Sequence, residues 1–200
     1  MRRARVARIL LSLSFTTQEG KAMRDLGLLI LRMTMGGLLV GHGAQKLFGL
    51  FEGHGPEGTG FFFEKLGLRP GKQWAITAGL GETGGGLLTL LGFLHPVGPI
   101  TTLAPMIVAW GRAHWGKPIW ITSGGAELPL TNMAVALALT LTGPGRYSLD
   151  RMFGMRTNPA LAMLVSAGVA AGSLIALSQP RPEPQPAPQP QTQTEPIAAR

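Results

Sequence analysis

The sequence has 200 residues, a formal net charge of +8 and no cysteine. Hydrophobic residues make up 45% of it and charged residues only 14%, a balance typical of membrane proteins. The absence of cysteine excludes a disulfide framework, a cysteine-ligated zinc or iron–sulfur site, and thiol chemistry performed by this chain.

The excess of positive charge lies mainly at the chain ends and between the apolar segments. No basic surface interleaved with aromatic residues is evident, so nucleic acid is not an expected partner. Basic residues in such positions favour anionic lipid head groups and the cytoplasmic side of a membrane. The expected partner is therefore the lipid bilayer, and the expected location is the plasma (inner) membrane of a bacterium, crossed several times.

Residues 1–22 are predicted to form a flexible N-terminal extension. They carry several arginines followed by an apolar patch, residues 9–15, that is too short to span a membrane. Met23 opens the next hydrophobic segment in the manner of a natural start. A cleaved signal peptide is the alternative interpretation, although no Ala-x-Ala-like site follows the patch.

Leu26–Phe51 is the first predicted membrane helix, and it is long enough to cross about 30 Å of hydrocarbon. Residues 52–72 are rich in glycine and phenylalanine, which predicts an interfacial loop with a short helix.

The second predicted span is Trp74–Phe93, and the third runs from Val97 to Trp110 or beyond with a kink at Pro105. The fourth is Glu127–Thr142, which a Gly-Pro-Gly sequence ends.

Pro159–Leu177 is apolar and uncharged, and it predicts a fifth span. Proline alternates with other residues after it, which predicts a disordered tail over 178–200. The expected fold is all-α: an integral membrane four-helix bundle over 23–153 with an additional C-terminal transmembrane helix over 159–177. The distribution of basic residues favours a cytoplasmic N-terminus only if residues 1–22 are counted. A fifth span would then place the C-terminal tail on the opposite side of the membrane.

Polar residues interrupt the first two predicted spans on one face each. Arg32, Gly36, Leu39, Gly43 and Lys46 follow one another at helical spacing, so they share a face of the first helix. A charge at the bilayer centre costs about 2.5–3.5 kcal/mol on insertion scales, so such residues usually pair, hydrate or serve a function.

The second span repeats the pattern with Ala78, Glu82, Gly85, Gly86 and Thr89 on one face. Small residues there allow another helix to approach closely.

Glu82 is the natural counter-ion for either Arg32 or Lys46. The remaining cation is then left for a ligand or for Glu127. The alternative is structural, because Arg32 and Lys46 lie near opposite ends of their helix and both could extend to lipid head groups.

His42 and His114 lie on different segments and could in principle ligate a haem, which is a weaker interpretation. Dinucleotide-binding, Walker-type and zinc-protease motifs are not evident, and Gly84–Gly86 lie within a helix, where we expect them to serve packing. No metal site or intrinsic cofactor is expected.

The chain resembles the DoxX family of small membrane proteins over about residues 24–153. Four blocks carry the resemblance: Gly41–Gly49 after Arg32 and Gly36, Gly81–Gly86, His114 with Lys117 and Glu127, and the most specific one, Gly143–Asp150. The resemblance implies a four-helix membrane bundle. It also implies roles reported for some members: thiosulfate oxidation with electron delivery to quinone, or oxidative-stress and catechol-resistance complexes in which soluble partners supply the catalytic groups.

The first functional hypothesis is a redox-associated membrane subunit that binds a quinone head group near Lys46, Glu82 and His114, with a soluble oxidoreductase docked on it. Any enzymatic activity would then belong to a complex. The candidate ligand-facing residues are Arg32, His42, Lys46, Glu82, His114 and Glu127.

The alternative is a non-enzymatic membrane scaffold or a carrier for a small molecule. A third, weaker hypothesis is a lipid-interacting stress protein whose Phe61–Phe63 segment enters the membrane interface. Assembly into a homo-oligomer is compatible with each of these functions.

Overall fold

The computed structural model describes residues 2–182, and side-chain surroundings from residue 18 onward. Every regular element in this part of the chain is a helix, which confirms the all-α prediction. The elements are α1 (Arg2–Phe48), α2 (Gly55–Lys65), α3 (Gly71–Leu91), α4 (Val97–Ala109), the π-helix η1 (Trp110–His114), the 3₁₀ helix η2 (Ile121–Ser123), α5 (Glu127–Thr142), α6 (Leu149–Met152) and α7 (Pro159–Ser178).

Helix α1 differs from the predicted first span at both ends. It continues without a break back to Arg2, so residue 22 does not mark a boundary in the backbone. No proline lies between Arg2 and Phe48 to interrupt it. The helix ends at Phe48 rather than Phe51 because Gly49 adopts a left-handed conformation, with φ of 69°.

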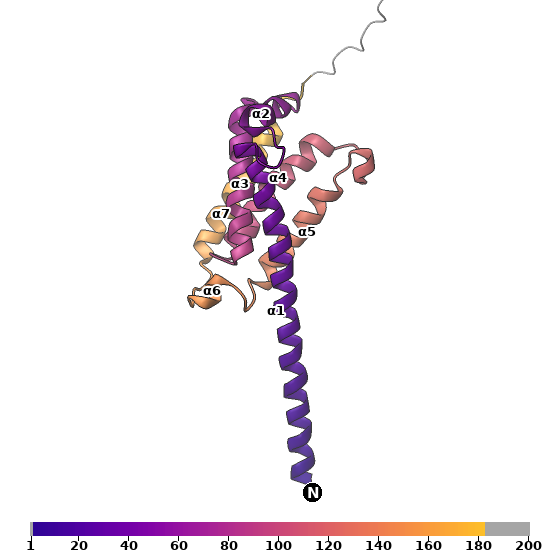
Figure 1. The fold of residues 1–200 in the computed structure, drawn as a ribbon, viewed down its shortest axis with the longest axis vertical. Helices are drawn as coiled ribbons and strands as arrows, with labels where there is room; N and C mark the ends of the chain where they lie inside the picture. Colours follow the sequence, from indigo (N-terminus) through magenta and orange to yellow (C-terminus); the bar gives the residue numbers. More distant parts are fainter. Residues whose placement is uncertain (1, 183–200) are drawn as a thin grey trace, which may run out of the picture.

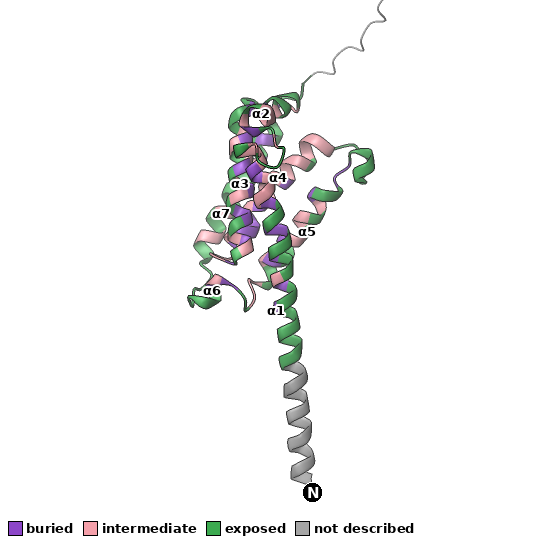
Figure 2. Cartoon of the chain, viewed as in Figure 1, coloured by how far each residue is buried: buried purple, intermediate pink, exposed green. Residues whose placement is uncertain are grey.

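Helices α1 and α4 both pack against α3, while α5 and α7 pack against α4 (Figure 1). Helix α2 lies at the end of the bundle where α1 stops and α3 begins, and α6 lies toward the opposite end. Buried residues lie on the inward faces of the helices, and the outer faces of α5 and α7 are largely exposed (Figure 2). The main buried apolar cluster joins α1, α4 and α5 and consists of Leu28, Met35, Leu39, Met106, Ala136 and Leu139.

Glycines set the separation of α1 and α3. A Cβ atom added to Gly36 would lie 2.7 Å from the Gly86 carbonyl oxygen, and one added to Gly43 would lie 2.7 Å from the Gly79 carbonyl oxygen. These distances are too short for any side chain, so the two backbones touch. A Cβ atom added to Gly84 would meet no atom within 4 Å. The expected packing role therefore does not apply to Gly84.

Arg32 and Asp150 hold the end of the bundle near α6. The buried Arg32 guanidinium donates hydrogen bonds to the carbonyl oxygens of Tyr147 and Leu90. The Asp150 carboxylate accepts one from each of the backbone N–H groups of Leu94 and His95, both at 2.8 Å. The most specific DoxX-like block therefore closes the α3–α4 turn.

Arg112 binds the C-terminal end of α7. Its guanidinium donates hydrogen bonds to the carbonyl oxygens of Ala176 and Gln179, which have no partner within the helix. Arg181 in turn donates to the Gly111 carbonyl oxygen at 3.1 Å. Helix α7 is thus docked on the bundle, as are the first residues of the predicted tail, whereas residues 183–200 lie outside the described part of the chain.

Two helical segments in the described residues are long and apolar enough to cross a membrane, Gln18–Phe48 and Pro159–Ser178. Helix α5 is also apolar but shorter. The observed bounds of α5 match the predicted fourth span, and those of α7 extend one residue beyond the predicted fifth.

The contact between α1 and α3 yields a prediction. Gly36→Ala should destabilise the protein by about 1–3 kcal/mol, because the methyl group forces the two backbones apart. Gly41→Ala on the same helix is the matched control, since nothing lies within 4 Å of its added Cβ. Thermal melting of the purified protein in detergent measures both, and equal melting temperatures would contradict the packing role.

Asp150 yields a second prediction. Asp150→Ala should lower the melting temperature clearly, because each buried N–H left without an acceptor costs about 1–3 kcal/mol. Asp150→Asn, which keeps one acceptor oxygen, should fall between Asp150→Ala and the wild type. Glu52→Gln changes an exposed carboxylate at the other end of the molecule and should have no effect. Wild-type melting of Asp150→Ala would overturn this assignment.

Candidate functional site

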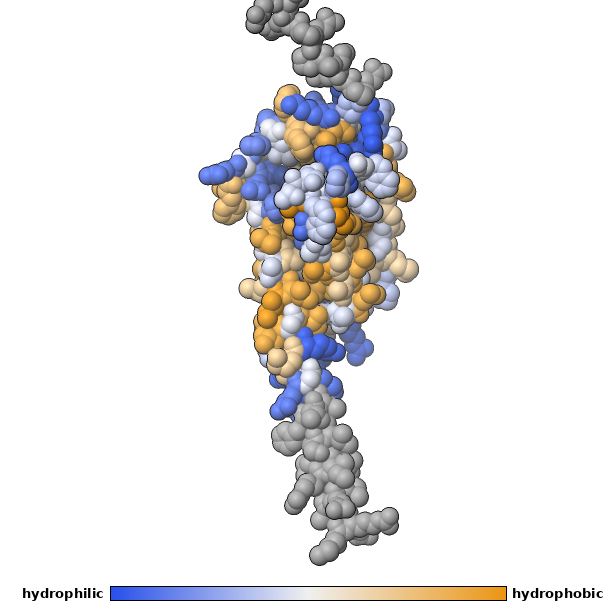
Figure 3. All heavy atoms as spheres, turned by 90° about the vertical axis from the view of Figure 1, so that its right-hand side faces the viewer, coloured by the Kyte–Doolittle hydropathy of each residue, from blue (hydrophilic) through white to orange (hydrophobic). Residues whose placement is uncertain are grey.

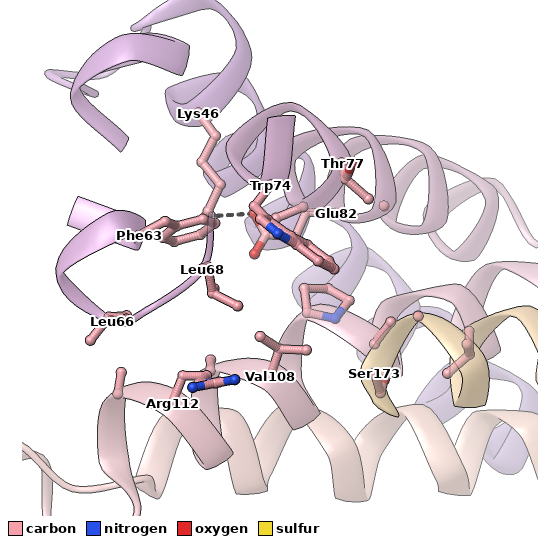
Figure 4. A pocket seen from close by; sticks show the side chains of 18 of the residues that line it. Lys46, Phe63, Leu66, Leu68, Trp74, Thr77, Glu82, Val108, Arg112 and Ser173 are labelled. Atoms are coloured by element: carbon pink, nitrogen blue, oxygen red, sulfur yellow. Dashed lines mark hydrogen bonds and ion pairs between the residues drawn. The ribbon is translucent and has the colours of Figure 1, made fainter. Parts of the chain in front are cut away.

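A cavity of about 600 Å³ lies between α2, α3, α4, η1 and α7. Its walls are mainly apolar, and polar groups enter from several separate elements (Figure 4). The polar and aromatic side chains that line it are Lys46, Phe62, Phe63, Trp74, Thr77, Glu82, Thr101, Arg112, His114 and Ser173. A mostly apolar cavity with a few convergent polar groups is the usual form of a small-molecule site.

Lys46 and Glu82 form an ion pair at the wall of this cavity. The Lys46 ammonium donates a hydrogen bond to Glu82 Oε2 at 2.6 Å, as the dashed line in Figure 4 shows. The Glu82 side chain is only 6% exposed and that of Lys46 is 20% exposed. Of the two cations that the sequence offers to Glu82, the structure therefore selects Lys46, because the α1–α3 contact brings these two side chains together.

His114 presents a hydrogen-bond acceptor. Its Nδ1 lies 2.7 Å from the Gly124 carbonyl oxygen, which can only accept, so Nδ1 carries the proton. In the neutral imidazole this leaves Nε2 unprotonated. The π-helical turn η1 supplies both His114 and Arg112 to the cavity wall, and such turns often occur at functional sites.

Helix α2 covers one side of the cavity with Phe62 and Phe63. It is held to the start of α3, where Lys72 donates a hydrogen bond to Glu57 Oε1 at 2.6 Å. This hydrogen bond lowers the pKa of the exposed Glu57 carboxyl. Gly60 and Gly71 fix the same contact, since a Cβ atom on Gly71 would overlap the Gly60 carbonyl oxygen.

The other three candidate residues lie away from the cavity lining. Arg32 is buried near α6 and bonds backbone carbonyl groups, so it does not extend to lipid head groups. His42 Nδ1 lies 3.1 Å from Gln45 Oε1 on the same helix. Glu127 accepts a hydrogen bond from the backbone N–H of Ile121 within its own loop, so it does not pair with Arg32.

Because only His114 of the two histidines lines the cavity, the arrangement does not favour the haem interpretation. In residues 2–182, no group of three or more His, Cys, Asp and Glu residues could hold a metal ion.

Most cavity residues are not among the sequence candidates, and three of them are Trp74, Arg112 and Ser173. Trp74 is the first residue of the second predicted span, and Arg112 follows the third predicted span shortly after Trp110. Ser173 lies on the predicted fifth span, far from the DoxX-like blocks. The signal that could have identified Ser173 is its spacing from Val165 and Val169, which places all three on one face of α7.

The ion pair yields a prediction. Lys46→Met should destabilise the protein by about 3–5 kcal/mol, because it leaves the Glu82 carboxylate buried without a counter-charge. The double variant Lys46→Met/Glu82→Gln should recover much of this loss. Thermal melting of the single and double variants tests the coupling. A double variant no more stable than Lys46→Met would show that the unpaired charge is not the cause.

Comparison with known proteins identifies the family. Residues 27–115 match the DoxX family model. The chain is 30% identical over 136 residues to the inner membrane protein YqjF of Escherichia coli strain K12, a match that covers 68% of this chain and 98% of that protein. No solved structure matches the chain. The helices, the ordered sequence blocks and these two matches together show that the chain is a membrane protein of the DoxX family.

Proposed function

We propose that this protein is a redox-associated membrane subunit that binds a quinone in the cavity between α2, α3, α4, η1 and α7. One observation carries the proposal: Lys46, Glu82 and His114, from three separate elements, line a single apolar cavity of about 600 Å³. A quinone head group combines a flat apolar ring with polar oxygens, which matches apolar walls with few polar groups.

The residues present suit such a ligand. Trp74, Phe62 and Phe63 offer aromatic surface to a ring. The Lys46 ammonium can donate to a ring oxygen while it stays paired with Glu82. A bound quinone would supply the electron-accepting chemistry, and His114 Nε2 can take up or release a proton at a ring oxygen.

The chain has no thiol of its own, so we assign the electron donor to a soluble oxidoreductase docked at the membrane surface. The end of the bundle that carries α2 and the loop of η2 is the proposed docking side, because the cavity lies there. The protein would thus act as the membrane part of an oxidative-stress or quinone-linked complex.

We further propose that the protein crosses the bacterial inner membrane five times: a four-helix bundle of α1, α3, α4 with η1, and α5, to which α7 adds the fifth span. Apolar side chains cover the middle of the face in Figure 3, and hydrophilic residues gather at both ends. Exposed leucine and methionine side chains on α7, such as Met163 and Leu164, would then face lipid. The N-terminal arginines favour a cytoplasmic start of α1, with the end of α7 on the opposite side.

Quinone binding tests this function. Purified protein should bind decylubiquinone or a menaquinone analogue saturably, and Glu82→Gln and Lys46→Ala should weaken binding at least tenfold while remaining folded and helical. Glu52→Gln and Lys21→Ala, at exposed positions outside the cavity lining, are matched controls and should bind as the wild type does. Equilibrium dialysis in detergent micelles measures the affinities.

Absence of binding to any folded form would overturn the quinone proposal and favour a membrane scaffold. Flux of a small apolar or phenolic molecule through vesicles without an electron donor would instead favour a carrier.

A further inference from the structure

Ser173 is a buried polar residue of α7 whose hydroxyl makes no hydrogen bond within the described part of the chain. It is 5% exposed, it lines the cavity, and its Oγ has no hydrogen-bond partner. A buried hydroxyl without a partner costs about 1–3 kcal/mol, so such a group in a cavity wall is expected to meet a ligand.

Arg112 adds a second unpartnered group to the same wall. Its Nε and Nη2 atoms are occupied by the carbonyl oxygens at the end of α7, but the buried Nη1 atom has no partner. Arg112 and Ser173 lie on the side of the cavity away from Lys46 (Figure 4). The cavity thus has a polar group at each of two separate places, with apolar walls between them.

The glycines of α7 shape this wall. Gly168 and Gly172 both line the cavity, and a Cβ atom added to either would meet no atom within 4 Å. They therefore do not bring α7 close to another helix, as small residues in a membrane helix usually do. They leave room for a ligand instead.

From these observations we propose that α7 completes the binding site, and that Ser173 Oγ and Arg112 Nη1 hydrogen-bond a second oxygen of the ligand across the cavity from Lys46. This inference rests on the proposed quinone function and specifies it: the ligand is a ring with oxygens at opposite edges. Ser173 can donate to a carbonyl oxygen or accept from a hydroxyl, so it can bind the oxidised and the reduced ring.

The test compares ligands that differ by one oxygen. Wild-type protein should bind 2-decylhydroquinone, kept under argon, about three- to tenfold more tightly than 2-decylphenol or 3-decylphenol, each of which lacks one of the two hydroxyls. Ser173→Ala should bind the hydroquinone more weakly and lose part of its preference over one of the two phenols, because Arg112 Nη1 still binds the same oxygen. Ser166→Ala, at an exposed position on the same helix, is the matched control and should keep the full preference.

A second variant tests the wall itself. Gly172→Leu should narrow the cavity and weaken binding of all three ligands while the protein stays folded, since the added Cβ atom would meet no atom within 4 Å.

The outcomes separate the two proposals. If the wild type binds none of the ligands, the quinone function fails and this inference with it. If binding depends on Lys46 and Glu82 but Ser173→Ala keeps the full preference for two oxygens, only the role of Ser173 is overturned. Wild-type binding by a folded Gly172→Leu variant would overturn the role of α7.

Discussion

The direct contact between the backbones of α1 and α3 is the constraint on which the rest of the structure depends. Glycines at Gly36, Gly43 and Gly86 let the two helices touch. This contact fixes the register at which Lys46 reaches Glu82, and it places Arg32 beside the α3–α4 turn at the other end. A side chain at these positions would change both the separation and the register of α1 and α3. The glycine contact therefore determines the helix packing and also the pairing of Lys46 with Glu82.

The two buried cations of α1 serve different purposes as a result. Arg32 donates hydrogen bonds to the carbonyl oxygens of Leu90 and Tyr147, and no residue of the Gly143–Asp150 block lines the cavity. Lys46 retains one carboxylate partner and borders open space. The planar guanidinium suits several fixed acceptors, whereas an ammonium has three N–H donors and can bind a ligand while it keeps its carboxylate partner.

Helix α7 enlarges the site beyond the residues that carry the family resemblance. Gly168 and Gly172 of α7 line the cavity. At the C-terminal end of α7, Arg112 donates a hydrogen bond to the carbonyl oxygen of Ala176. Arg112 therefore both holds α7 in place and lines the cavity. The lining between Lys46 and Ser173 is mostly apolar, and a hydrogen bond is stronger in such surroundings than in solvent.

The sequence by itself determined the helical class, the inward faces of α1 and α3, and the approximate helix bounds, because apolar length and helical periodicity are local properties. Only the tertiary structure decided which cation pairs with Glu82, because that depends on helix register. It also separated Arg32, His42 and Glu127 from the cavity, and it added Trp74, Arg112 and Ser173. Residues distant in sequence become one site only through packing, which spacing along the chain does not encode.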